Sequence, residues 1–140
     1  MVNCDVPPGR MLTWYGGVVH TEETWNPRSN YVVRVPLGDS VLLVDGEKRG
    51  TVASRINHSC DPNCVMEVFI FHKTLILGIV SKRLIRSGEF LSISYGDQQF
   101  DGIKTCMCMS KNCRDREKRE VLNFDPLDTP SAVATPYKFT

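Results

Sequence analysis

The sequence lacks both long apolar runs and a strong charge of either sign. No stretch approaches the roughly 20 apolar residues of a membrane helix, and the N-terminal MVNCDVPPGR has no apolar run of the kind found in secretory signals. The formal net charge is only +1, so we expect no membrane partner and no direct sequence-specific binding to nucleic acid. Hydrophobic residues still make up 41% of the 140 residues, which is enough for one domain with a packed core.

Helical periodicity is also scarce. The one convincing helix pattern is RDREKREVL, residues 114–122, and the tail after Asn123 carries three prolines, which predicts a loosely ordered segment. Short β-branched and aromatic runs predict strands instead. They lie at residues 11–19, 31–35, 41–45, 65–71, 75–81 and 90–96. His72 and Lys73 interrupt two of these runs as the turn of a hairpin would. The pattern indicates a mainly β domain of many short strands.

Cysteines are present in a pattern that favours metal binding or chemistry. In a chain without an export signal, six cysteines are less typical of disulfides. Three of them lie close together in CMCMSKNC, residues 106–113. Two more lie in RINHSCDPNC, residues 55–64, which also holds a histidine, two asparagines and a proline. An irregular polar segment of this kind, held by a rigid sheet, is a typical place for a site.

These motifs together resemble a known family. NHSCDPN (residues 57–63), a strand that ends in SYG (94–96) and a downstream C-x-C-x4-C (106–113) resemble the SET domain with its post-SET zinc motif. That family transfers methyl groups from S-adenosyl-L-methionine (SAM) to protein lysines, often on histone tails. The resemblance implies a β-clip of several short sheets with a pseudo-knot, in which NHSC and the SYG strand meet side by side. It divides the chain into a SET domain at 1–98, a post-SET segment at 99–116, and a short helix with a tail at 117–140.

The resemblance also implies which residues bind the cofactor and act on the substrate. Asn57 and His58 match residues that contact SAM. Tyr95 matches the catalytic tyrosine, which also lies against the cofactor, and Tyr15 matches an aromatic wall of the lysine channel. The alternatives are ordinary structural roles: Asn57 and His58 as caps of a turn, and the two tyrosines as core residues with hydrogen-bonded hydroxyls.

The cysteines match a structural metal site in the same family. Cys106, Cys108 and Cys113 match the post-SET zinc ligands, and Cys60 matches the fourth. Four thiolates would hold Zn²⁺ in a closed tetrahedral site and staple the C-terminal segment over the active site. The alternative is a set of free cysteines. Outside this site, we expect Cys64 to be buried as a small apolar residue and Cys4 to be exposed.

The sequence departs from the family pattern at three places. The family has a G-x-G segment ahead of its D-I-x-x-G, whereas here Asp5 is already the aspartate and only MVNC precedes it. We therefore expect an N-terminally truncated fragment, gene model or degenerate copy, with weak or no SAM binding and an unpaired sheet edge. Ser54 and Arg55 stand where the family often has R-F, which predicts a different local arrangement. Ile93 stands where the family usually has an aromatic residue.

Three hypotheses follow. The first is a SAM-dependent protein-lysine N-methyltransferase that acts on a histone tail in chromatin, in the nucleus; this location and this partner come from the resemblance alone. The second is a catalytically inactive SET-like module that binds a peptide or protein partner. The third is a small zinc-stabilised structural module without a peptide groove. SAM binding separates the first from the second, and peptide binding separates the second from the third.

Overall fold

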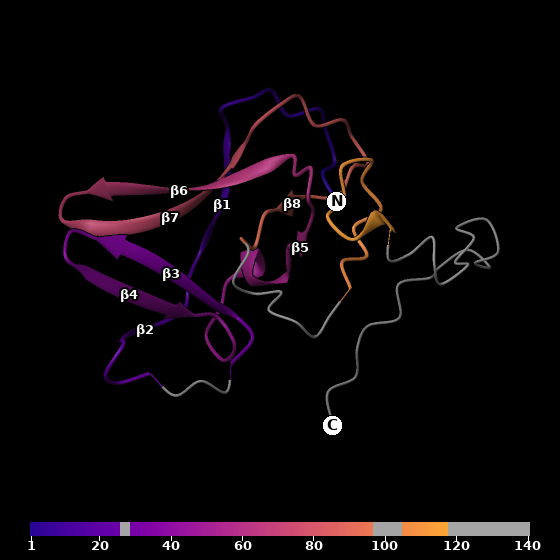
Figure 1. Cartoon of the computed structure of the whole chain (residues 1–140). Coiled ribbons are helices and arrows are strands. Elements are labelled where there is room, and N and C mark those ends of the chain that lie inside the picture. The colour runs from indigo at the N-terminus through magenta and orange to yellow at the C-terminus, as the bar shows by residue number, and fades with distance from the viewer. Residues whose placement is uncertain (26–28, 97–104, 118–140) are drawn as a thin grey trace.

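The described residues form short strands, as the sequence predicts, and these strands are arranged in three small sheets (Figure 1). The computed structural model describes residues 1–25, 29–96 and 105–117. The described part holds no helix with the length and apolar character that a membrane crossing requires. The predicted helix at 114–122 is described only at its start, where residues 116–117 are helical. Its remainder and the predicted tail lie outside the described residues.

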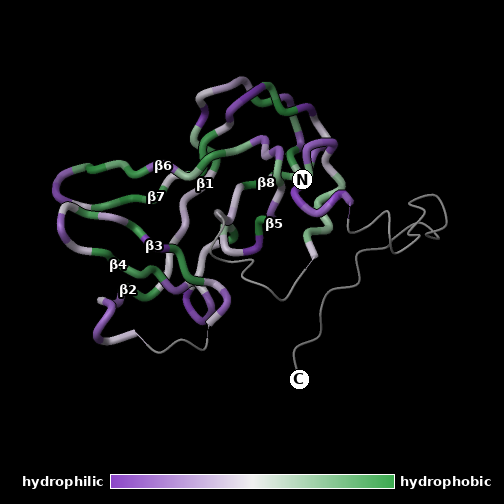
Figure 2. Tube along the Cα trace, in the orientation of Figure 1, coloured by the Kyte–Doolittle hydropathy of each residue, from purple (hydrophilic) through white to green (hydrophobic). Residues whose placement is uncertain are grey.

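The first sheet has the order β1-β7-β6. Its strands are β1 (Met11–Tyr15), β6 (Cys64–Phe71) and β7 (Thr74–Ser81), all antiparallel. The hairpin predicted at His72 and Lys73 is confirmed: both residues have positive φ, and Phe71 faces Thr74 across the turn. Figure 2 shows apolar stretches along β6 and β7 on either side of this polar turn.

The second sheet has the order β2-β4-β3. It contains β2 (Val18–Thr21), β3 (Val32–Leu37) and β4 (Ser40–Asp45), with β3 and β4 joined by a turn that contains Gly38 at φ 59°. The apolar run at 11–19 therefore divides into β1 and β2, one in each sheet, and is not a single strand. At the break, a Cβ on Gly17 would lie 2.2 Å from the backbone oxygen of Asp45. The chain can change sheets there because glycine has no side chain.

The third sheet is a parallel pair of two-residue strands, β5 (Asn57–His58) and β8 (Ser92–Ile93). The resemblance implied that these two segments meet, and they do. The prediction of a strand over 90–96 is wrong in length, because within this segment only Ser92 and Ile93 pair with β5. Phe90 and Tyr95 are instead held by hydrogen bonds to the side chains of Asn63 and His58. A 3-10 turn, η1 (Val52–Arg55), leads into β5.

The core takes side chains from all three sheets and from η1. Its most deeply buried side chains are Val35, Leu43, Cys64, Ile79, Ile85 and Cys106. Cys64 is fully buried and Cys4 is exposed, as predicted. Ile93 is also buried. Ser54 and Arg55 contact different partners. The Ser54 hydroxyl donates to the Thr51 carbonyl, and the Arg55 guanidinium lies 5.5 Å from the Tyr31 ring centre.

Candidate active site and metal centre

Three of the predicted site residues, Asn57, His58 and Tyr95, come together where β5, β8 and residues 105–117 meet, a region we call the junction. Asn57 and His58 form β5, and Tyr95 follows β8 by two residues. The Asn57 side chain is exposed and makes no hydrogen bond within the described part of the chain. Its amide can therefore serve a polar ligand, which is the role that the sequence predicts.

Tyr95 is fixed at both its backbone and its hydroxyl. Its N–H donates to Nδ1 of His58 at 3.1 Å, and its hydroxyl donates to the Ile56 carbonyl at 2.6 Å. The two rings lie 5.4 Å apart between centres. Burial, and then the nearby Tyr31, raise the pKa of Tyr95, so its hydroxyl keeps its proton at neutral pH. Tyr95 thus holds a phenol beside the β5 backbone.

His58 connects Tyr95 to the cysteines. Burial, and then the positive charge of Arg114, lower the pKa of His58, so the imidazole is neutral near pH 7. Because Nδ1 accepts from Tyr95, the proton of a neutral ring is on Nε2, and Nε2 lies 3.4 Å from Sγ of Cys60. One side chain therefore contacts both the tyrosine and a predicted metal ligand.

Tyr15 lies at the end of β1 in the core. Its side chain is buried, and its hydroxyl donates to the Tyr31 carbonyl at 2.7 Å. Burial, followed by the charges of Asp45 and Tyr95, raises the pKa of Tyr15 to about 12. The hydroxyl is therefore satisfied as a core hydroxyl would be, while Tyr95 is close enough to influence its ionisation. This geometry is compatible both with core packing and with a wall beside Tyr95.

The four predicted metal ligands form one cluster. The Sγ atoms of Cys60, Cys106, Cys108 and Cys113 all lie within 4.8 Å of one another. Cys60 and Cys106 are 3.7 Å apart at sulfur. Four thiolates about 2.3 Å from a zinc ion would stand about 3.8 Å apart, so the donor set and the spacing fit Zn²⁺. The cluster joins the loop after β5 to a segment more than 40 residues downstream.

Hydrogen bonds within the cluster favour a thiolate at Cys108. Burial opposes ionisation of Cys108, but the Cys60 N–H and the Ser110 hydroxyl outweigh it and lower the pKa of this thiol to about 6. Burial raises the pKa of Cys106. The two shifts oppose each other because the first thiolate to form accepts hydrogen bonds from its neighbouring thiols. Asp115 accepts from the Cys106 N–H at 2.7 Å and so fixes the backbone of a second predicted ligand.

Comparison with known proteins decides the family. The SET domain model matches residues 1–96. The chain belongs to the SET-domain family. It is 43% identical over 75 residues to the probable histone-lysine N-methyltransferase set-23 of Caenorhabditis briggsae, across 51% of this chain and 31% of that protein. It is 35% identical over 118 residues to the histone-lysine N-methyltransferase trithorax of Drosophila virilis, across 79% of this chain and 3% of that protein.

A third relative is set-2 of Caenorhabditis elegans, also named a histone-lysine N-methyltransferase, with 35% identity over 116 residues, 78% of this chain and 8% of that protein. The chain spans less than a third of the length of each of these relatives. The names of all three relatives describe histone-lysine N-methyltransferases.

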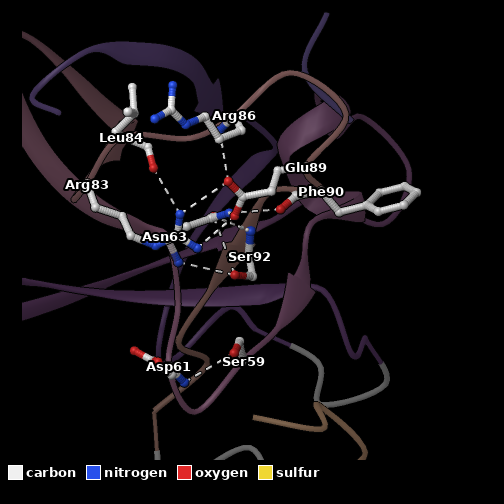
Figure 3. A network of polar contacts seen from close by, with 9 residues as sticks. All are labelled: Ser59, Asp61, Asn63, Arg83, Leu84, Arg86, Glu89, Phe90 and Ser92. Atoms are coloured by element: carbon white, nitrogen blue, oxygen red, sulfur yellow. Dashed lines mark hydrogen bonds and ion pairs between the residues drawn. The ribbon is translucent and has the colours of Figure 1, made fainter. Parts of the chain in front are cut away.

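The SET domain contains one functional candidate that sequence reasoning missed. Asn63, the last residue of NHSCDPN, is buried and lies at the centre of a network of polar contacts with the segment that precedes Tyr95 (Figure 3). The sequence did contain a hint: Asn63 precedes Cys64, which was expected to be buried, and a buried asparagine needs hydrogen-bond partners for its amide. The identity of those partners could not be read from the sequence.

Proposed function

We propose that this SET domain transfers a methyl group from SAM to a lysine side chain of a protein, and that the protein is a histone. The observation that carries the proposal is the contact of Tyr95 with His58 and Ile56 in the segment that resembles the family's cofactor and catalytic motif. Histone tails are proposed because the curated relatives are named histone-lysine N-methyltransferases. A nuclear, chromatin-bound location follows from the same inference.

The cofactor fits the polar groups that the junction leaves available. The exposed Asn57 amide can donate and accept, as a molecule with a polar base and an amino-acid end requires. His58 is neutral, so it adds no positive charge against a cationic sulfonium. When bound, SAM supplies a methyl group on that sulfonium, which an amine can accept by in-line displacement.

Deprotonation of the substrate lysine is the main electrostatic requirement. A free lysine has a pKa near 10.4, so deprotonation near pH 7.4 costs roughly 4 kcal/mol. The burial that raises the pKa of Tyr15 and Tyr95 lowers that of an amine in the same surroundings. The Tyr95 hydroxyl donates to the Ile56 carbonyl at 2.6 Å, and both oxygens keep lone pairs that can accept the N–H groups of one amine. The lone pair of the amine is then left for the attack on the methyl group. Positioning then supplies much of the remaining acceleration.

The metal has a structural role in this proposal. One Zn²⁺ held by the four clustered cysteines would fix residues 105–117 to the loop after β5. A closed Cys₄ site leaves no position for substrate, so it orders the chain and takes no part in the transfer. Because His58 contacts Cys60, order at the metal reaches the cofactor side of β5.

Two measurements test the function. SAM binding is measured by isothermal titration calorimetry, and methyl transfer is measured on histone peptides with labelled SAM. Tyr95→Phe should lower the transfer rate about 10²–10³-fold while the fold is retained, because one positioned hydroxyl is lost. Tyr31→Phe is the control, since this nearby hydroxyl makes no hydrogen bond within the described residues. Equal rates for Tyr95→Phe and the parent chain would contradict the role of Tyr95.

The same data decide between the alternatives. Peptide binding without SAM binding would indicate the catalytically inactive module, which recognises a partner and does no chemistry. Zinc binding without binding of SAM or peptide would indicate the zinc-stabilised structural module. SAM-dependent labelling of a lysine, lost in Tyr95→Phe and kept in Tyr31→Phe, supports the enzyme.

A further inference from the structure

Asn63 forms several hydrogen bonds to residues 89–92, the segment that precedes Tyr95. Its side chain is 2% exposed. Its Oδ1 accepts from the Ser92 N–H at 2.9 Å, and its Nδ2 donates to the Phe90 carbonyl at 2.8 Å. Its own N–H donates to the Ser92 hydroxyl at 3.2 Å. The side-chain amide thus bonds to one backbone N–H and one backbone C=O of the segment at 90–92, as a peptide group of a neighbouring strand would.

The segment that Asn63 holds leads directly to Tyr95. Ser92 pairs with Asn57 in the parallel β5–β8 ladder, which is only two residues long. Two parallel rungs give little resistance to sliding or fraying, since such ladders are normally longer and covered on both faces. The Asn63 amide adds a rung on β8, and Tyr95 lies three residues beyond Ser92.

Charged neighbours fix which way the amide points. Glu89 Oε1 lies 3.4 Å from Nδ2 of Asn63 and also accepts from Arg83 at 2.7 Å. The other Glu89 oxygen accepts from the Arg86 N–H at 2.8 Å. Both partners of Nδ2, the Phe90 carbonyl and the Glu89 carboxylate, are acceptors. The site therefore requires a side chain with an acceptor on one branch and a donor on the other, which asparagine has and aspartate at neutral pH lacks.

We propose that Asn63 is a positioning residue that sets the place of Tyr95 relative to Asn57 and His58. It does not touch substrate or cofactor in this role; it holds β8 against β5 so that the Tyr95 hydroxyl stays at the Ile56 carbonyl. The inference rests on the proposed methyl transfer, since a position matters for catalysis only if Tyr95 acts there.

Asn63→Asp is the sharpest variant, because it keeps the shape and the acceptor but turns the Nδ2 donor into an oxygen that faces two acceptors. Asn30→Asp makes the same change of charge at an exposed position and is the control. At saturating SAM, kcat should fall about 10–100-fold, since a buried acceptor loses its partner. The KM for peptide, the dissociation constant of SAM and the zinc content should stay at the values of the parent chain.

Rates are divided by the folded fraction at the assay temperature, which removes a loss due only to instability. Ser92→Ala is the second variant if Asn63→Asp does not fold: it removes one hydroxyl from the same contact and leaves the amide bonds intact. It should lower kcat by about threefold to tenfold. The proposal would be overturned if the variant that folds has the same kcat per folded molecule as the parent chain. A rise in KM with kcat unchanged would overturn it as well.

Hydrogen–deuterium exchange separates this inference from the proposed function. In Asn63→Asp, the amides of Ser92 and Tyr95 should lose protection while those of β6 and β7 keep it. If the parent chain transfers no methyl group, the proposed function fails and exchange alone decides the inference. Wild-type protection at Tyr95 would then overturn it, and lost protection confined to Ser92–Tyr95 would support it.

Discussion

The β6–β7 hairpin and the junction are held together by different means. In the hairpin, eight consecutive residues of each strand are paired, from Cys64 with Ser81 to Phe71 with Thr74. In the junction, β5 and β8 pair over two residues, and the remaining contacts come from side chains. These include the Asn63 amide, the Tyr95 hydroxyl, the His58 imidazole and the four cysteines.

The difference predicts where single substitutions matter. In a long ladder each side chain can be exchanged while the backbone bonds persist, so an exposed change costs little. At the junction a side chain is itself the bond, and its removal leaves a buried group without a partner. Apart from Tyr15 on β1, the candidate functional residues lie in the second region. A chain can place unlike side chains around a ligand only where regular pairing stops.

The largest effect is expected at the metal cluster. Cys108→Ser should lower the bound zinc from about one equivalent to near zero, since removal of one thiolate opens a closed tetrahedral site. Residues 105–117 should then lose exchange protection, whereas the β6–β7 hairpin should keep it. Metal analysis and hydrogen exchange measure the two results, and Cys4→Ser, at an exposed cysteine outside the cluster, is the control. A zinc-free variant with a fully protected 105–117 segment would break the comparison.

A smaller, pH-dependent effect is expected at Glu89. The ion pair with Arg83, and then the Arg86 N–H, lower the pKa of this carboxyl to about 2, compared with an ordinary value near 4.3. A lowered folded-state pKa stabilises the fold above the unfolded-state value, and this contribution disappears as the pH falls from about 5 towards 2. Because Glu89 is partly exposed, the contribution is about 1 kcal/mol or less.

Glu89→Gln tests this prediction by removing the charge. The difference in unfolding free energy between parent and variant should be largest near pH 7 and should shrink in acid, as measured by urea denaturation at several pH values. Arg34 and Glu22 form an ion pair on the second sheet, with side chains 49% and 60% exposed, so Glu22→Gln is the control. A difference in unfolding free energy that does not change with pH would contradict a stabilising role for the Glu89 charge.

The smallest effect is expected at the tip of the hairpin. Ile70 is 71% exposed, so Ile70→Lys should change the unfolding free energy by about 0.5 kcal/mol or less and leave methyl transfer unaltered. It should also reduce self-association at high concentration, because β6 is an edge strand with exposed apolar residues. Light scattering and thermal melting measure the two results.

The buried neighbour Leu77→Ala gives the contrast within the same hairpin. This side chain is 3% exposed, and its truncation should cost about 2–5 kcal/mol. If Ile70→Lys destabilises the protein as much as Leu77→Ala does, the hairpin tip is packed against something that the described residues do not include.

Several features were readable from the sequence for a local reason. The hairpin followed from two β-branched runs around His72 and Lys73, since alternation and turn residues act over a few positions. Metal binding was indicated for Cys106, Cys108 and Cys113 by their close spacing, whereas Cys60 as the fourth ligand came from the family resemblance. The pairing of β5 with β8 followed from the family resemblance and could not have been obtained from periodicity, since neither strand is long enough to show one.

Other features were decided only by tertiary structure. The segment from 90 to 96 alternates like a strand, yet only Ser92 and Ile93 pair, because the Asn63 side chain and the His58 ring take the hydrogen bonds on either side of them. The partner of the Tyr15 hydroxyl is a carbonyl 16 positions away. The residue types therefore determined the chemistry that this SET domain can offer, and long-range packing decided which atoms meet, since a hydrogen bond depends on distances that only the folded chain sets.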